Sequence, residues 1–214
     1  MLKFVLSVVA LMAAQPVIAD NYAMMLGSRQ IGTLVTNGDA LTSTLDNTPL
    51  GVADGTFQAS VNPVELPDGT LADQFLGINR GGKTRDISVI RQDGRAVDVT
   101  VVPANDATDL SKPEAVPAGV LFPSELFSRL ERTGGCPGAM TMYDGRRVVS
   151  IATASSAVVD GVTVCTMDYR VTAGKGHLSP FNFKSLNMQL AYAGGALARV
   201  TVSAGGFDVS MVRQ

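Results

Sequence analysis

"RVTVSAGGFDVSM", residues 199–211, alternates apolar and polar side chains on both sides of a Gly-Gly pair. Val200 and Val202 precede the glycines, and Val209 and Met211 follow them with the same spacing of two. Successive side chains of a β-strand point to opposite faces, so this alternation predicts two half-buried strands. Two glycines supply the positive φ angles that a tight hairpin turn needs. The stretch therefore predicts an antiparallel hairpin with one dry face and one wet face.

The same alternation recurs along the chain, for example in residues 86–89 and 97–101. Further two-residue turn signals lie between such segments, at Gly81-Gly82, Asp93-Gly94, Asp144-Gly145, Asp160-Gly161 and Gly194-Gly195. Together these patterns predict about twelve strands, joined mostly by hairpins.

One segment departs from the alternation and predicts a helix over residues 122–135. Pro123 stands near its start, Leu126 and Leu130 contribute to an apolar stripe, and Gly134-Gly135 ends it. The segment before it, residues 103–119, is polar and rich in proline, which indicates a surface connection between two groups of strands.

A sheet of about twelve hairpin-linked strands must curl or close to protect its edges. We therefore predict a single all-β domain over residues 20–214. Its curled antiparallel sheet should form a half-open β-barrel or β-spiral, with the one short helix in its interior or at one mouth. A two-sheet β-sandwich is the alternative.

The first nineteen residues have the anatomy of a secretory signal peptide. Lys3 precedes an apolar run over residues 4–14, and residues 17–19 place short side chains where signal peptidase reads them. We expect cleavage between Ala19 and Asp20. The run is shorter than the roughly 20 residues of a membrane-spanning helix, and no later segment is apolar for long enough. The mature protein is therefore expected to be soluble in the periplasm.

The composition argues against several classes of function. The net charge is −2, and no basic patch suggests a nucleic-acid partner. His177 is the only histidine, and its glycine and lysine neighbours predict an exposed side chain in a loop. One histidine and two cysteines do not make the usual zinc site. The chain also lacks a nucleophile elbow, a phosphate-binding glycine loop and EF-hand spacing, so we expect no metal, no cofactor and no catalytic constellation.

The two cysteines, Cys136 and Cys165, both lie in the predicted mature chain. An even pair in an oxidising compartment usually forms a disulfide. Closing a loop of this length should stabilise the fold by about 3.6 kcal/mol in the chain-entropy account. Two unpaired buried thiols are the alternative.

Between the cysteines, "MTMYDGRRVVS", residues 140–150, predicts a hairpin whose tip is Asp144-Gly145. Tyr143, Asp144, Arg146 and Arg147 are the candidate contact residues. Turn-flanking arginines are usually solvated, which favours a structural hairpin with both arginines in water. In the alternative, an arginine folds onto Tyr143 or Asp144, or faces an acidic ligand or partner.

The block of Cys136, Tyr143 to Arg147 and Cys165 resembles an exported bacterial family known as domain of unknown function 3108. Its members carry a cysteine followed by an aromatic-Asp-Gly-basic-Arg signature late in the chain. The predicted mature start, "YAMMLGSRQIGTL", and the helix before the cysteine are similar as well. Family members often continue with an aromatic residue where this chain has Val148.

The resemblance implies a periplasmic protein that is all-β apart from a helix and has no established activity. In outline the family is similar to curled-sheet envelope proteins, including lipoprotein carriers that hold acyl chains and envelope-integrity proteins with a disulfide in a β-spiral. Such a likeness of fold is weak support for a function.

We therefore expect a non-enzymatic periplasmic protein of the cell envelope. Its concave sheet would face an apolar, lipid-like ligand or an envelope protein, in a role such as envelope integrity. The alternative is a hydrolase that acts on envelope polysaccharide through paired carboxylates. An apolar lining of the concave face would favour the first hypothesis, and carboxylates about 5–10 Å apart the second.

Overall fold

A computed structural model of the chain describes residues 19–46, 48, 54–177 and 182–214. The predicted signal peptide lies outside these residues, apart from Ala19. The described strands are β1 (Asp20–Leu26), β2 (Arg29–Asn37), β3 (Ala40–Leu45), β4 (Gly55–Glu65), β5 (Leu71–Arg80), β6 (Arg85–Gln92), β7 (Arg95–Val102), β8 (Met140–Tyr143), β9 (Arg147–Val159), β10 (Val162–Gly174), β11 (Ser185–Ala193), β12 (Ala196–Ala204) and β13 (Phe207–Arg213). One α-helix, α1 (Pro123–Thr133), and three short 3₁₀ helices, η1 (Ala104–Asp106), η2 (Asp109–Ser111) and η3 (Pro113–Ala115), complete the described elements.

All thirteen strands belong to one sheet, in the order β7-β6-β5-β4-β3-β2-β1-β13-β12-β11-β10-β9-β8. Every strand pair is antiparallel, and the first and last strands pair with each other, with Tyr22 opposite Arg213. The hairpin predicted at Gly205-Gly206 is confirmed, since β12 and β13 meet there and both glycines have positive φ angles of 58° and 85°. A single sheet means that the β-sandwich alternative is wrong.

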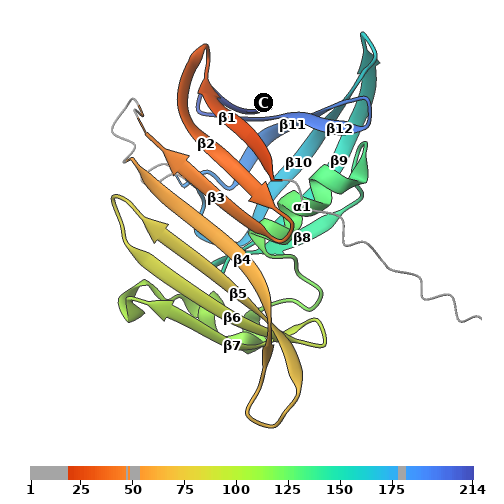
Figure 1. Cartoon of the computed structure of the whole chain (residues 1–214). Helices are drawn as coiled ribbons and strands as arrows, with labels where there is room; N and C mark the ends of the chain where they lie inside the picture. The colour runs from red at the N-terminus through yellow and green to blue at the C-terminus, as the bar shows by residue number, and fades with distance from the viewer. Residues whose placement is uncertain (1–18, 47, 49–53, 178–181) are drawn as a thin grey trace, which may run out of the picture.

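The sheet curls strongly but does not close into a barrel, because β7 and β8 stand at opposite ends of the strand order. Figure 1 shows the curl, with α1 lying across the concave side. The two ends of the sheet approach each other at one place. A Cβ atom added to Gly145, in the turn after β8, would lie 2.4 Å from Ile87 Cγ2 in β6, so only glycine fits there. The prediction of a half-open curled sheet is confirmed.

The helix forms where the sequence predicts it, but it is one residue shorter at its start and two residues shorter at its end than the predicted range 122–135. Pro123 is its first residue, the Phe122 N–H donates to Glu125 Oε2 (2.8 Å), and Gly134 ends it in the left-handed region with φ of 70°. Its apolar side contacts two core clusters. Leu126 and Leu130 belong to the cluster of Ile151, Leu190 and Tyr192.

The second cluster fills the part of the curl formed by the first strands. The Phe122 ring, at the start of α1, stacks on Phe75 with centroids 4.6 Å apart and planes at 6°. Both rings are fully buried beside Val89 and Tyr143. The helix therefore occupies the interior of the curled sheet, as predicted, and its side chains join the two clusters.

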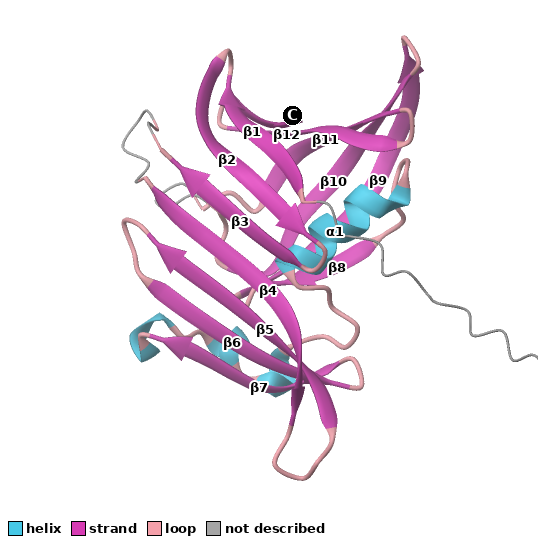
Figure 2. Ribbon diagram, viewed as in Figure 1, coloured by secondary structure: helices cyan, strands magenta, loops and turns pink. Residues whose placement is uncertain are grey.

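Different segments of the chain contact the two edge strands of the sheet, β7 and β8. Beside β7 lie η1, η2 and η3 (Figure 2), which contact this strand, although five of its eight residues are exposed. The outer edge of β8 is bonded to Leu121, whose N–H donates to Thr141 O and whose carbonyl accepts from the Tyr143 N–H, both at 2.9 Å. β8 has only four residues, whereas β9 has thirteen, so β9 extends far beyond its outer neighbour.

Candidate functional site

The predicted hairpin around Asp144-Gly145 is present, but its side chains turn into the protein. Tyr143 is fully buried, its hydroxyl donates to the Leu110 carbonyl, and burial raises its pKa. Asp144 Oδ1 accepts the backbone N–H groups of Arg146 (3.0 Å) and Arg147 (2.9 Å). This carboxylate therefore shapes the turn that redirects the chain from β8 into β9.

Both arginines were expected in water, and that expectation is wrong. Arg146 Nε donates to the Asp106 carbonyl (2.9 Å), and the Ser111 hydroxyl donates to the Gly145 carbonyl (3.2 Å). Arg147 Nε lies 2.8 Å from Asp144 Oδ2, and the Arg147 side chain is 19% exposed. The connection over residues 103–119 packs against the turn and leaves both arginines half-buried, which local composition does not reveal. The alternative in which an arginine folds onto Asp144 is the one that the structure supports.

His177 is also half-buried, so the expectation of an exposed loop histidine is wrong. Arg147 Nη1 lies 2.7 Å from His177 Nδ1, and the Tyr169 hydroxyl lies 2.7 Å from His177 Nε2. A guanidinium only donates, so Nδ1 accepts and the neutral ring carries its proton on Nε2. Burial, and secondly the charge of Arg147, lower the pKa of His177 to about 4. The ring is therefore neutral at pH 7 and belongs to a buried polar chain of Asp144, Arg147, His177 and Tyr169.

The disulfide between Cys136 and Cys165 is confirmed, with Cα atoms 5.5 Å apart. Cys136 lies between α1 and β8, and Cys165 lies in β10. Because β9 lies between β8 and β10 in the sheet, the bond crosses the middle strand of the three, as predicted. The Thr153 hydroxyl in β9 also donates to the Pro137 carbonyl (2.6 Å), so the segment after α1 is fastened to the same strands.

The interior of the curl is lined by apolar side chains, as expected of a binding protein rather than of a hydrolase with paired carboxylates. The carboxylates at the start of the helix serve the fold. Arg91 pairs with Glu125 (2.6 Å) and Asp73 (2.7 Å) and stacks over the Phe122 ring at 4.8 Å. In the described part of the chain, no group of three or more His, Cys, Asp or Glu side chains could hold a metal ion. None of its helices is long and apolar enough to cross a membrane.

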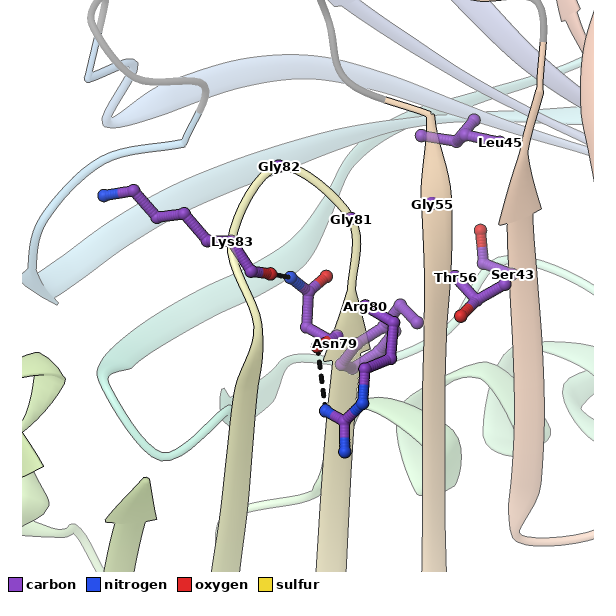
Figure 3. Close-up of a pocket in the computed structure, with 10 residues that line it drawn as sticks. Ser43, Leu45, Gly55, Thr56, Asn79, Arg80, Gly81, Gly82 and Lys83 are labelled. Carbon is purple, nitrogen blue, oxygen red and sulfur yellow. Dashed lines mark hydrogen bonds between the residues drawn. The ribbon is translucent and has the colours of Figure 1, made fainter. Parts of the chain in front are cut away.

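Two cavities are lined by residues of the described chain. One, of about 320 Å³, lies between β3, β4 and the turn from β5 to β6 (Figure 3). Figure 3 shows Asn79 bonded to the Lys83 carbonyl, with the Lys83 side chain pointing away from Ser43 and Thr56. The Arg80 guanidinium, which lines this cavity, is already paired with the Asp86 carboxylate. This leaves few polar groups that could bind a ligand in that cavity.

The second cavity, of about 420 Å³, lies where the end of α1 meets the first and last strands. Asp20, Glu131, Arg132 and Arg213 line it, together with Ser128, Gly38 and the turn at residues 194–196. The sequence analysis missed this site. Glu131 looks like any polar helix residue, and its partners Tyr22 and Thr36 lie 109 and 95 residues away in the chain.

The outer edge of β9 is the third candidate, also missed from the sequence. Residues 154–159 are all exposed, and Val158 and Val159 are 72% and 55% exposed. Outside the sheet, no described residue forms a backbone hydrogen bond with them. Two features of the sequence could have indicated this exposed edge. The stretch "ATASSAVV", residues 152–159, has no charge, and Pro137 prevents β8 from continuing along it.

Comparison with known proteins identifies no family and no function for this chain. No family model matches this chain, and no curated protein matches it. Among solved structures, the chain is similar to a crystal structure of a β-barrel-like protein of domain of unknown function DUF1849 from Brucella abortus. The likeness has 15% sequence identity and a TM-score of 0.45, and covers 92% of this chain and 95% of that one.

Proposed function

We propose that the protein is a non-enzymatic, exported protein of the cell envelope that binds a partner protein along the free edge of β9. The observation that carries this proposal is the bare edge of residues 154–159, where six consecutive residues are exposed and no described residue outside the sheet forms a backbone hydrogen bond with them. An unprotected edge strand pairs readily with another extended chain. Many proteins recognise extended segments in this way, with main-chain hydrogen bonds providing the affinity.

The filled interior is the reason for preferring a partner protein to an apolar ligand. Both clusters reach α1, and residues such as Leu130, Ile151 and Leu190 are at most 1% exposed. A lipid-like ligand would have to displace the helix or its side chains. A dye that fluoresces on apolar surfaces should therefore not bind the native protein. Dye binding that fatty acids reverse would restore the apolar-ligand hypothesis.

The geometry of the hairpin identifies the groups that would bind. β9 and β10 are joined by a two-residue turn, Asp160-Gly161, with positive φ angles of 50° and 78°. In such a hairpin the flanking pair, Val159 and Val162, exchanges hydrogen bonds, and pairs alternate from there. The N–H and C=O groups of Val158 and Ser156 therefore point away from β10, toward the free edge.

The partner we infer is an extended segment with uncharged side chains where it lies along residues 154–159. The edge itself carries no charge over that length, so a charged side chain placed beside it would lose water without gaining an ion pair. Small side chains such as Ala154, Ser155 and Ala157 leave room for the partner's side chains on both faces. An oxidising compartment fits the disulfide, and export fits the predicted signal peptide.

The test places a photo-crosslinking residue at position 157, in a cell that makes the protein naturally. Illumination should join the protein to one partner. The matched control carries the same residue at Gln189, which is exposed on β11 but flanked by paired strands on both sides.

Ser156→Pro completes the test, because it removes an N–H that the sheet does not use. This variant should keep its melting temperature and lose the adduct. Equal adducts from positions 157 and 189, or an adduct that survives Ser156→Pro, would contradict edge pairing. An adduct of twice the chain's own mass would identify a second copy and contradict a separate partner.

A further inference from the structure

The 420 Å³ cavity beside the end of α1 contains a carboxylate whose second oxygen has no partner. Glu131 Oε1 accepts both the Tyr22 hydroxyl (2.9 Å) and the Thr36 hydroxyl (2.7 Å). Oε2 receives no hydrogen bond from any described residue, and no described cation lies within ion-pair distance of Glu131. Oε2 is also not among the buried polar atoms that lack a partner, so it is open to the cavity that Glu131 lines.

The two hydroxyls fix the position of this carboxylate. Tyr22 and Thr36 are 1% and 3% exposed, and they come from adjacent strands, β1 and β2. The Tyr22 ring also packs edge-on against Phe127, one turn earlier on α1, at 5.4 Å. Glu131 is therefore held from the sheet side, with Oε1 turned to the sheet and Oε2 left for a ligand. Such fixed placement lowers the ordering cost of binding.

The charges around the cavity are balanced. Asp20 pairs with Arg213 across β1 and β13, which leaves Glu131 and Arg132 as the groups with unused capacity. Arg132 donates to the Ser128 hydroxyl and comes within 4.0 Å of Asp39, but its side chain is 66% exposed. A guanidinium has five N–H donors, so most of its donors remain available for a carboxylate.

Glycine turns complete the lining and keep it open. Gly38, Gly194 and Gly195 all have positive φ angles, of 59°, 57° and 81°. A Cβ atom added to any of them would meet no other atom within 4 Å. The turns therefore need glycine for their backbone conformation, and they leave space in which a small ligand can approach the main chain.

We propose that this cavity binds the zwitterionic end of an amino-acid-like ligand, with the ammonium group on Glu131 Oε2 and the carboxylate on Arg132. A lining with two acidic and two basic side chains suits a ligand that is neutral overall but carries both charges. Neither a simple cation nor a simple anion satisfies both unused groups. The cavity lies at the end of α1, and none of the residues that line it belongs to β9, so the ligand is proposed separately from the partner there.

The experiment is an NMR titration of the exported protein with three small probes: glycine, methylammonium and acetate. Glycine should shift the backbone amides of Gly38, Gly194, Gly195 and Ala196. Its affinity should exceed that of either single-charge probe by about tenfold or more, since each alone lacks one charge-assisted hydrogen bond. Equal affinities for the three probes, or shifts that spare these four amides, would overturn the proposal.

Glu131→Gln is the decisive variant. Glutamine keeps a carbonyl oxygen for Tyr22 and Thr36, so the fold should survive, and the melting temperature checks this. Burial raises the pKa of Glu131, so the surroundings within the fold disfavour its charged form on balance, and the neutral amide should be tolerated. The variant should bind glycine about tenfold more weakly or worse. Glu65→Gln, an exposed carboxylate at the end of β4, is the matched control and should bind as the parent protein does. Unchanged glycine binding in Glu131→Gln would overturn the assignment.

Discussion

Breaking the Cys136–Cys165 bond should destabilise the protein by about 2–4 kcal/mol. The two cysteines are 29 residues apart, and the chain-entropy relation gives about 3.6 kcal/mol for a loop of that length. Reduction of the unmodified protein is the cleanest perturbation. Cys165 is fully buried, so replacing it would add the cost of a cavity to the cost of the lost crosslink.

Urea unfolding of the oxidised and reduced protein measures the effect. With a slope of about 2–3 kcal/mol per molar urea for a domain of this size, the midpoint should fall by about 1–2 M on reduction. The variant Cys136→Ala with Cys165→Ala controls for effects of the reductant, because its midpoint should not respond. A difference below about 1 kcal/mol between oxidised and reduced protein would refute the chain-entropy reasoning.

Hydrogen exchange locates the loosened region. The crosslink joins the segment before β8 to β10 across β9, so the extra local opening on reduction should be found in these three strands and in the segment between α1 and β8. In β4 to β7, amides that exchange by global unfolding should lose protection by the same amount, about 2–4 kcal/mol, and amides that exchange by local opening should not change. New local opening in β4 to β7 as well would contradict a local role of the bond in ordering the three strands.

Three further predictions rest on other contacts. Arg91→Met should lower the free energy of unfolding by about 2–4 kcal/mol, because it leaves the carboxylate of Glu125 largely buried and without its ion pair. Urea unfolding measures this loss. Adding Glu125→Gln should recover part of it. His177 has a pKa of about 4 in the folded protein against about 6.5 when unfolded, so the unfolded chain takes up the proton first. Stability should therefore fall by up to about 3 kcal/mol as pH drops from about 6.5 to 4, and His177→Gln should flatten that part of the pH profile; an unchanged profile would exclude His177 as its source. The intact mass of the exported protein should correspond to a chain that begins at Asp20, and a membrane-bound species that keeps residues 1–19 would contradict the predicted cleavage.

The fold could be predicted because its signals are local. Alternation with period two marks the strands, glycine and Asp-Gly pairs mark the turns, and one segment with helical spacing stands out between Phe122 and Gly135. The disulfide was predicted from two cysteines in a chain with a predicted export signal. Each of these inferences needs only neighbouring residues or the number of cysteines, so it can be made without knowledge of the tertiary structure.

The polar contacts could not be predicted in the same way, because their partners are distant in the chain. Arg146 meets Asp106 across 40 residues, and Arg147 meets His177 across 30. Glu131 depends on strands about 100 residues earlier. Near each of these residues the sequence is polar and rich in glycine, as at a solvated surface. Only the curl of the sheet decides that they face inward.

The hairpin at Asp144-Gly145 is buried because it lies where the two ends of an open sheet are held together. The sheet ends at β7 on one side and at β8 on the other, and the segment from η1 to η3 leaves one end and packs against the other. Arg85, at the start of β6, pairs with Asp106, whose carbonyl accepts from Arg146. The Tyr143 hydroxyl reaches the Leu110 carbonyl in the same segment.

Together with the close approach of Gly145 to Ile87, these contacts hold the two ends of the sheet together without a continuous ladder of backbone hydrogen bonds. The aromatic, acidic and basic residues that looked most like a binding motif are thus committed to keeping the sheet curled. This junction protects the edge of the sheet only as far as β8, which has four residues, because Pro137 lies just before it and lacks the N–H needed to continue the ladder. Beyond it, β9 keeps the exposed edge at residues 154–159, and that is why the surface available to a partner lies next to the motif rather than on it.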